Sequence, residues 1–329
     1  MRAAVCRDYG PPDVVAVVDD HPDPEVGDGQ VRVRVGAAAV NFPDVLLVAN
    51  EYQIEVPTPF VPGSEFAGTV ESLGPGVTSG ASGFAVGDRV FGSTLSGAFA
   101  ELVVVPEASL TRIPDGVDDR VAAAFGVAHR TAYHVLRSVA RLQPGEELVV
   151  LGAGGGVGLA AVQLGALAGA SVTAVASSAE KLAVAGSCGA SRVIDHRAGD
   201  LRAALRSTLP QGADVVVDPV GGDLSEPALR ALRWGGRFVT VGYASGTIPR
   251  IPLNLVLLKG VQVLGFQFLS FATHAPDEHR RNEDELLALL ASGQVLPHIG
   301  ATHPLSEVGT ALTRVAGGRA IGKVIIDLM

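Results

Sequence analysis

The feature that most constrains the fold is a glycine loop placed between an apolar run and a helix-forming run. Residues 148–151 are apolar, residues 152–158 read Gly-Ala-Gly-Gly-Gly-Val-Gly, and a helix is predicted from about 157 to 167. In a strand–loop–helix unit, glycines let the backbone approach a pyrophosphate, and the helix N-terminus presents N–H groups to it. The sequence therefore predicts a dinucleotide site at this loop. The expected contacts are Gly155, Gly156, Val157 and Gly158.

Strand and helix patterns continue to alternate after this loop. Apolar strands are predicted at 171–176, 193–194, 215–218, 237–242 and 261–266, with helices at 178–186 and 201–209. Near-continuous apolar strands separated by helices are typical of a parallel sheet covered on both faces. Six such strands fit the α/β, doubly wound Rossmann fold.

The residues before this region have a different texture. Residues 31–35 alternate apolar and charged side chains, and 66–73 and 99–105 are further strand-like runs between Gly and Pro turns. At roughly 150 residues per domain, a chain of 329 residues predicts two domains. We expect a mainly β domain at 1–122 and a dinucleotide-binding domain at 123–267. The segment 268–329, with a helix at 277–291 and a strand at 323–328, is expected to return to the first domain.

Charge and cysteine content exclude several classes of function. The chain carries 25 Lys and Arg against 34 Asp and Glu, and it has no basic stripe, so we expect no nucleic-acid partner. Its two cysteines cannot form a disulfide framework. The apolar stretches are interrupted by glycines and no signal-peptide pattern is seen, so the sequence favours a cytoplasmic protein without membrane contact.

Residues at the ends of the predicted strands indicate which dinucleotide binds. An NAD site usually has an acidic residue after the second strand, but Ala176 stands there, followed by Ser177 and Ser178. Lys181 and Arg197 would supply positive charge for a 2′-phosphate, so NADPH is the predicted cofactor; Lys181 has the alternative interpretation of a solvated helix residue. Further cofactor contacts are expected from His196, Val220, Gly242, Tyr243, Phe266 and Phe268.

A set of motifs along the whole chain resembles the medium-chain dehydrogenase/reductase superfamily, in its zinc-independent NADPH:quinone oxidoreductase branch. The motifs are Asn41-Phe42-Pro43-Asp44, Phe60 to Gly68, Gly87-Asp88-Arg89-Val90, Thr131-Ala132-Tyr133, the glycine loop, Val217 to Gly222 and Gly322-Lys323-Val324. The resemblance implies a GroES-like substrate domain split between the two ends of the chain, with the active site in the cleft beside the dinucleotide domain. It also implies that Thr131 faces the nicotinamide and that Lys323 belongs to the cofactor residues.

The same resemblance argues against a catalytic metal. Zinc-dependent relatives carry Cys, His and Cys where this chain has Asn41, Ser64 and Val127, and these replacements bind zinc poorly. His129 and His134 are five residues apart and do not share a helical face well. We therefore expect no metal site.

Without a metal, hydrogen-bond donors must stabilise the charge that develops on the acceptor oxygen. Asn41 and Tyr52 are the candidate donors, because Leu46 stands where family members often carry a tyrosine. Asn41 has the alternative interpretation of a turn residue, and Tyr52 that of a loop aromatic covering the core. Asp44 is interpreted as a residue that orients Asn41 or as a cap of the helix that follows. Arg130 is interpreted as a helix cap or an anion contact.

An electron-poor, conjugated acceptor needs less help from such donors, which favours quinones, enones and enals as substrates. Two other functions stay open: an enoyl-thioester reductase, and a non-catalytic nucleotide-binding redox sensor. The apolar strand 261–266 would be unsafe as an uncovered edge, so we expect a homodimer formed through it.

Overall fold

The computed structural model describes residues 1–77 and 83–329, which form two compact units. Unit 1 contains residues 1–127 and 296–329, and unit 2 contains residues 128–295. The chain returns to unit 1 at Leu296 rather than at the predicted Phe268. The reason is that helices α8 (Phe268–His274) and α9 (Pro276–Ala291) pack on unit 2, where Glu283 and Asn282 bond to His134.

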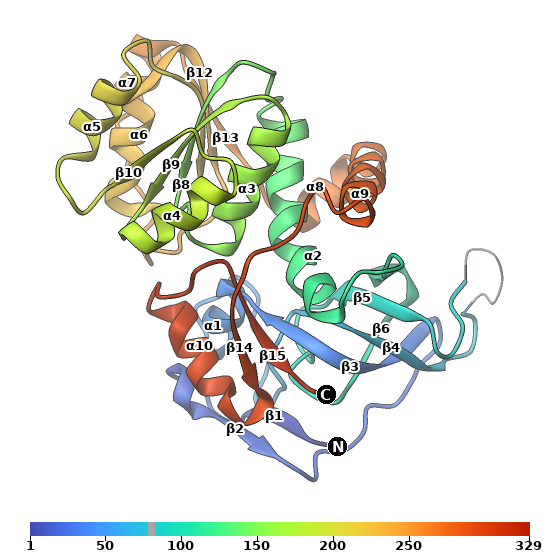
Figure 1. Cartoon of the computed structure of the whole chain (residues 1–329). Helices are drawn as coiled ribbons and strands as arrows, with labels where there is room; N and C mark the ends of the chain where they lie inside the picture. The colour runs from blue at the N-terminus through green and yellow to red at the C-terminus, as the bar shows by residue number, and fades with distance from the viewer. Residues whose placement is uncertain (78–82) are drawn as a thin grey trace. The chain divides into compact units, whose positions relative to one another are not determined.

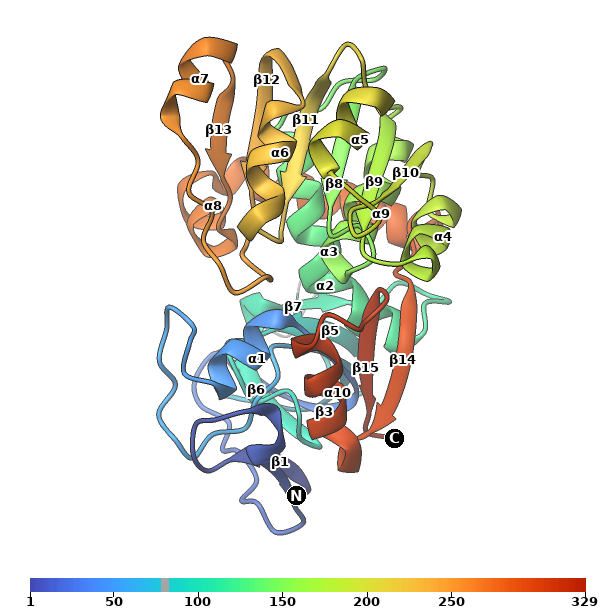
Figure 2. The ribbon, with the colours of Figure 1, turned by 90° about the vertical axis from the view of Figure 1, so that its left-hand side faces the viewer.

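Unit 2 is built on a six-stranded parallel sheet with the strand order β10-β9-β8-β11-β12-β13, visible side by side in Figure 2. The strands are β8 (Glu147–Leu151), β9 (Ser171–Ala176), β10 (Arg192–Asp195), β11 (Ala213–Asp218), β12 (Leu232–Thr240) and β13 (Gln262–Gly265). In this order β9 and β10 lie on one side of β8, and β11, β12 and β13 lie on the other. The predicted doubly wound fold is confirmed.

Helices cover both faces of this sheet (Figure 1). They are α3 (Gly156–Leu167), α4 (Ala179–Ser187), α5 (Leu201–Thr208), α6 (Ser225–Arg230) and α7 (Leu253–Lys259). Side chains of α5, α6 and α7 share one apolar core with β8, β11 and β12. The amphipathic pattern of α5 explains this packing, because Leu201 and Leu205 are buried one turn apart while Asp200 caps the first turn by accepting from Ala203 N–H.

Unit 1 is mainly β. A seven-stranded sheet has the order β14-β15-β3-β4-β5-β7, with β6 also paired to β3, and β1 pairs with β2. The strands are β1 (Ala3–Cys6), β2 (Val15–Val18), β3 (Gln30–Val40), β4 (Glu65–Leu73), β5 (Arg89–Ser93), β6 (Leu102–Pro106), β7 (Leu110–Arg112), β14 (Ile299–Pro304) and β15 (Lys323–Asp327). The return of the chain end to unit 1 is confirmed, because β15 pairs antiparallel with β3; in Figure 1 the red β15 lies beside the blue β3.

Three helices complete the described architecture: α1 (Phe42–Val48), α2 (Asp119–His134) and α10 (Val308–Ala316), with a wider π-helical turn over Val135–Val139 after α2. The alternating strand pattern of residues 31–35 is realised in β3, whose valines enter the core of unit 1. Within the described ranges, no helix is long and apolar enough to cross a bilayer.

Candidate functional site

The glycine loop of unit 2 is packed so closely that a side chain at Gly152, Gly154 or Gly158 would collide with its neighbours. A Cβ on Gly158 would lie 2.1 Å from the carbonyl oxygen of Gly152, and a Cβ on Gly154 would lie 2.6 Å from the Lys181 side chain. Gly152 itself has a φ of 59°, a left-handed conformation that glycine adopts without strain. These contacts hold the start of α3 against the end of β8, the geometry that the sequence predicts for a pyrophosphate cradle.

The N-terminus of α3 has the properties of an anion site. Gly155 is the capping residue in an extended conformation, and no side chain among the described residues caps the helix there. The backbone N–H groups of the first turn belong to Gly156, Val157 and Gly158. They therefore have no capping side chain as a hydrogen-bond acceptor. Together with the helix dipole they favour a bound phosphate group.

Basic side chains converge where β9 and β10 end. Ala176 and Asp195 are register neighbours in the parallel pair, so the residues that follow them lie close together. Lys181 Nζ donates to Ser177 Oγ over 3.3 Å. Burial and the nearby Arg197 lower the pKa of Lys181, and burial and the same arginine also lower the pKa of His196.

These pKa shifts have a simple electrostatic meaning. Burial is the larger cause and the charge of Arg197 the second for both Lys181 and His196, so an anion bound beside them would stabilise their charged forms. Ser178 has a local task, because its hydroxyl accepts from the Lys181 backbone N–H as the cap of α4.

The ends of β11 and β12 carry the next group of predicted cofactor residues. Buried Asp218 accepts from the backbone N–H groups of Val220 and Gly221 over 2.9 and 2.8 Å, which fixes the turn after β11. Tyr243 packs against this turn, where its ring lies 2.9 Å from the position of a Cβ on Gly221. Gly242 is half-buried beside it. The turn is thus rigid and keeps Val220 in a fixed place.

Other predicted cofactor residues have clear protein partners. Phe266 and Phe268, which follow β13, stack around His134 with ring centroids 6.1 and 5.6 Å away. Thr131 is buried on α2.

In unit 1 a buried network surrounds Asn41. Lys323 Nζ donates to Asn41 Oδ1 over 2.6 Å and to Glu65 Oε2 over 2.8 Å, and Asn41 Nδ2 donates to Glu65 Oε2 over 3.0 Å. Glu65 Oε1 accepts from the backbone N–H of Val127 over 2.6 Å. Glu65 is fully buried and Lys323 is 4% exposed, so the ion pair is shielded from water. The network fixes the orientation of the Asn41 amide, because Oδ1 faces Lys323 and Nδ2 faces Glu65.

Asn41 is the capping residue of α1, and Asp44 is the third residue of the helix. The Asp44 carboxylate accepts from the Asn41 backbone N–H over 2.7 Å, so Asp44 takes part in a capping box and also holds Asn41 in place. Burial raises the pKa of Asp44 to about 7, although the bond from Asn41 and the charge of Lys323 act in the opposite direction. Tyr52, the second predicted donor, lies in a loop and packs against the core of unit 1.

The comparisons with known proteins agree with this architecture. Residues 27–115 match the alcohol dehydrogenase GroES-like domain, and residues 156–291 match the zinc-binding dehydrogenase domain. Quinone oxidoreductase-like protein 2 of Bos taurus is 36% identical over 329 residues, which cover 99% of this chain and 92% of that protein. The chain belongs to the quinone oxidoreductase family of the medium-chain dehydrogenases/reductases.

Two solved structures of similar proteins cover the whole chain. A mycobacterial protein complexed with NADPH is 30% identical, with a TM-score of 0.92 and complete coverage of both chains. Escherichia coli quinone oxidoreductase complexed with NADPH is 26% identical, with a TM-score of 0.91 and complete coverage of both chains. The quinone oxidoreductase fold therefore extends over both units.

The second matched domain is named for zinc binding. The residues of this member of the quinone oxidoreductase family do not fit that metal. At the three positions where zinc-dependent relatives carry ligands, the chain has Asn41, Ser64 and Val127. The Asn41 oxygen already accepts from the Lys323 ammonium, which places a fixed positive charge 2.6 Å from that atom. A second cation there would be repelled, and none of the three side chains is a usual zinc ligand. These residues do not fit a zinc ion.

Sequence reasoning did not connect Lys323 with Asn41 and Glu65. The resemblance implied Lys323 as a cofactor residue, whereas the structure uses its ammonium to bind residues that lie 282 and 258 positions earlier in the chain. The expected return of the chain end to the first domain was a usable signal, because β15 pairs with β3 and brings Lys323 close to Asn41. Glu65 was not proposed at all.

Proposed function

We propose that this protein is an NADPH-dependent oxidoreductase that transfers hydride to quinones or conjugated carbonyl compounds without a catalytic zinc ion. The observation that carries the proposal is the combination of a closely packed glycine loop with the basic cluster of Lys181, His196 and Arg197 at the adjoining strand ends.

The choice of NADPH over NADH rests on charge. The pyrophosphate would bind at Gly155 to Gly158, and the basic cluster would receive a 2′-phosphate, with Ser177 as a neutral hydrogen-bond partner. Ala176 offers no carboxylate to a ribose 2′-hydroxyl. The two similar structures reported above are NADPH complexes, which supports the same choice. Val220, Gly242, Tyr243, Phe266, Phe268 and Thr131 complete the proposed cofactor residues.

Bound NADPH would supply the hydride, and the chain's own residues would stabilise charge on the acceptor. Asn41 is the proposed donor, because Lys323 and Glu65 fix the orientation of its amide before a substrate arrives. In this proposal Lys323 is a positioning residue that acts through Asn41. Tyr52 is the second donor. Donors of this kind suit an acceptor that is already electron-poor, such as a quinone or an enone.

The proposal is tested by measuring NADPH oxidation with three acceptors: 1,4-benzoquinone, a simple enone and a 2-enoyl thioester. We expect turnover with the quinone or the enone, and much weaker turnover when NADH replaces NADPH. Turnover of the thioester alone would favour an enoyl-thioester reductase. Binding of NADPH without oxidation by any acceptor would favour a nucleotide-binding sensor.

We further propose that the protein is a homodimer formed through β13. This strand is the edge of the six-stranded sheet, and Val263 on it is 46% exposed. Leu253, Leu257 and Leu258 of the adjacent α7 are more than two-thirds exposed. Such an apolar edge is an aggregation risk unless a second copy covers it. Sedimentation of the wild-type chain against a Val263→Lys variant tests this, with the expected shift from dimer towards monomer.

A cytoplasmic location is also proposed. In the described structure, Cys6 and Cys188 are both free thiols, which suits a reducing compartment.

A further inference from the structure

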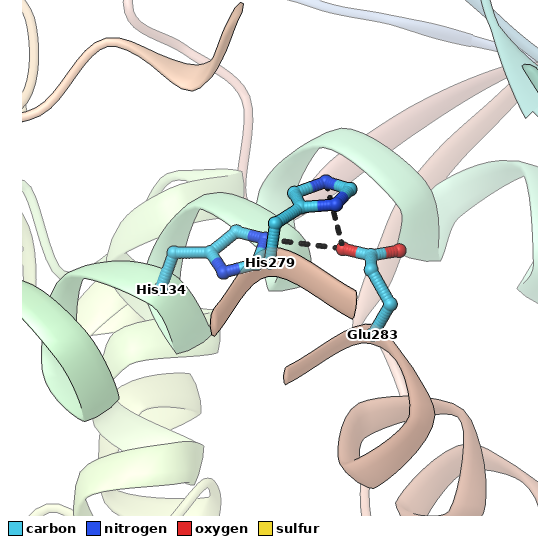
Figure 3. A group of neighbouring side chains, drawn as sticks. All are labelled: His134, His279 and Glu283. Carbon is cyan, nitrogen blue, oxygen red and sulfur yellow. Dashed lines mark hydrogen bonds and ion pairs between the residues drawn. The ribbon is translucent and has the colours of Figure 1, made fainter. Parts of the chain in front are cut away.

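A cluster of two histidines and one glutamate lies in unit 2, apart from the residues proposed to bind the cofactor phosphates. His134 ends α2, and His279 and Glu283 lie one turn apart on α9 (Figure 3). Residues spaced by four share one face of a helix, so both α9 side chains point towards His134. Sequence analysis did not find the cluster, because His134 and Glu283 are 149 residues apart.

The three side chains bring their ligand atoms together. Glu283 Oε1 lies 3.1 Å from His134 Nε2 and 3.9 Å from His279 Nε2. One ligand atom from each residue can be chosen so that all three lie within 4.8 Å of one another. Ligand atoms around a tetrahedral zinc ion are about 3.3 Å apart, since each bond is about 2.0–2.1 Å long. A modest inward rotation of His279, whose side chain is 28% exposed, would bring the atoms to that spacing.

The outer contacts of the cluster hold two of these residues in a fixed orientation. Arg130 Nε binds Glu283 Oε2 over 2.6 Å, which leaves Oε1 directed towards the two imidazoles. Buried Asn282 places Nδ2 3.0 Å from His134 Nδ1 and donates to Ser138 Oγ over 2.9 Å. Asn282 Oδ1 accepts from Arg281 Nη2 over 3.0 Å. A metal on His134 Nε2 would require this amide to turn, give up that bond and present Oδ1 to a protonated Nδ1. Outer partners of this kind are typical of metal-binding histidines and carboxylates.

The surroundings are closed on one side and open on the other. The ring of Phe271 lies 4.8 Å from that of His134, and Phe266 and Phe268 lie around the same imidazole. His134 is fully buried, whereas Glu283 is 21% exposed and His279 lies at the surface side of the cluster. An ion would therefore enter from the side of α9. Around His134 the aromatic rings would exclude water from the site.

We propose that His134, His279 and Glu283 bind one divalent transition-metal ion, with zinc as the best fit, and with water as the fourth ligand. Two imidazoles and one carboxylate suit zinc and do not suit magnesium or calcium, which prefer oxygen ligands. The site uses none of the three positions at which zinc-dependent relatives carry ligands. Its effect would be to fasten α9 to the end of α2. Its three ligands take no part in the proposed hydride transfer, although Phe266 and Phe268 beside His134 are also proposed cofactor residues.

The test is metal binding by the full chain after exhaustive dialysis against a chelator. Zinc is added by equilibrium dialysis and counted by metal analysis, and cobalt is added separately to record the visible absorption that a tetrahedral site gives. We expect one zinc per chain, a tetrahedral cobalt spectrum and a higher Tm with zinc than with chelator. His279→Ala and Glu283→Gln should each weaken zinc binding by at least about 100-fold, because loss of a direct ligand exceeds the 10–100-fold cost of losing an outer partner.

His274→Ala is the matched control, since this exposed histidine lies on neighbouring α8 outside the cluster. It should bind zinc as the wild type does. Circular dichroism establishes that each variant is folded. The proposal is wrong if the wild-type chain retains no zinc, or if folded His279→Ala binds zinc as tightly as His274→Ala does. The cluster would then be a network of ion pairs centred on Arg130 and Glu283. NADPH oxidation is measured separately, so failure here leaves the proposed function standing.

Discussion

The proposed preference for NADPH includes a role for the side chain at the end of β9. Ala176→Asp would place a carboxylate next to Ser177 and Lys181, where the 2′-phosphate is proposed to bind. Two negative groups at short range repel each other, so we expect the Kd for NADPH to rise at least about tenfold, or ~1.4 kcal/mol. The Kd for NADH should change less.

Ala176→Asn is the control for this substitution, because it adds a side chain of the same shape without charge at a site that is 3% exposed. Fluorescence titration with NADPH and with NADH gives the Kd of each variant relative to that of the wild type for each cofactor. A wild-type chain that prefers NADH would contradict the assignment of Lys181 and Arg197 to a phosphate.

Asn41 carries the proposed charge stabilisation on the acceptor. Asn41→Ala should slow single-turnover hydride transfer to a quinone by roughly 10- to 1000-fold, the range for loss of one preorganised donor. NADPH affinity should stay close to normal, because the glycine cradle belongs to other residues. The substitution also removes an acceptor from buried Lys323, so Tm should fall as well.

The rate of the folded variant separates the two roles of Asn41. If hydride transfer is unchanged below its Tm, Asn41 is a structural residue that holds Lys323, and Tyr52 becomes the remaining donor.

At the scale of one element, the start of α3 depends on Gly158. A methyl group there would lie 2.1 Å from the Gly152 carbonyl oxygen, so Gly158→Ala must displace the loop. We expect loss of NADPH affinity together with a lower Tm. Gly186→Ala is the matched control, because this glycine of α4 has open space around its Cβ position and lacks a positive φ. It should raise stability by up to about 1 kcal/mol. Equal NADPH binding by the two variants would disprove the close-packing argument.

Helix α1 begins with a carboxyl group that is costly to ionise. The pKa of Asp44 is raised from 3.8 to about 7 in the fold, mainly by burial. The folded state therefore favours the protonated form, and this stability is complete below pH 4 and is lost as pH rises through about 7. Asp44→Asn keeps an acceptor for the Asn41 N–H and removes the charge.

Urea unfolding at several pH values tests whether the stability that depends on Asp44 falls as the pH rises. Between pH 5 and pH 8 the wild type should lose about 1–3 kcal/mol more stability than Asp44→Asn does. Parallel pH profiles for the two proteins would show that Asp44 does not titrate in this range.

Elements with a strong local pattern were predicted to within a few residues. Strand β9 was predicted over the same residues that form it, and α3 and α9 were each predicted to within one residue of their observed ends. Strand β12 was predicted to begin at Arg237 but begins at Leu232, because Gly235 and Gly236 interrupt its apolar run and look like a turn. Before these glycines only Leu232 pairs with β11, and continuous pairing with both β11 and β13 begins at Arg237.

At the scale of the whole molecule, topology was predictable and side-chain networks were not. The glycine loop and the strand–helix alternation were sufficient to predict a doubly wound parallel sheet of six strands. The contacts of Lys323 with Glu65, and of His134 with Glu283, depend on the pairing of β15 and on the docking of α9. Such long-range contacts leave no periodic signal, and the docking of α9 also explains why unit 2 extends past Phe268 to Val295.

The central claim is that hydride passes from NADPH to a conjugated acceptor without a metal at the residues around Asn41. The most direct test is single-turnover oxidation of NADPH by 1,4-benzoquinone, using enzyme dialysed against a chelator until metal analysis finds none. NADPH with deuterium on the transferred position is compared with the ordinary cofactor. The account predicts that chelation leaves the rate unchanged and that deuterium slows it. A chelated enzyme that binds NADPH but recovers hydride transfer only after zinc is restored would contradict the account.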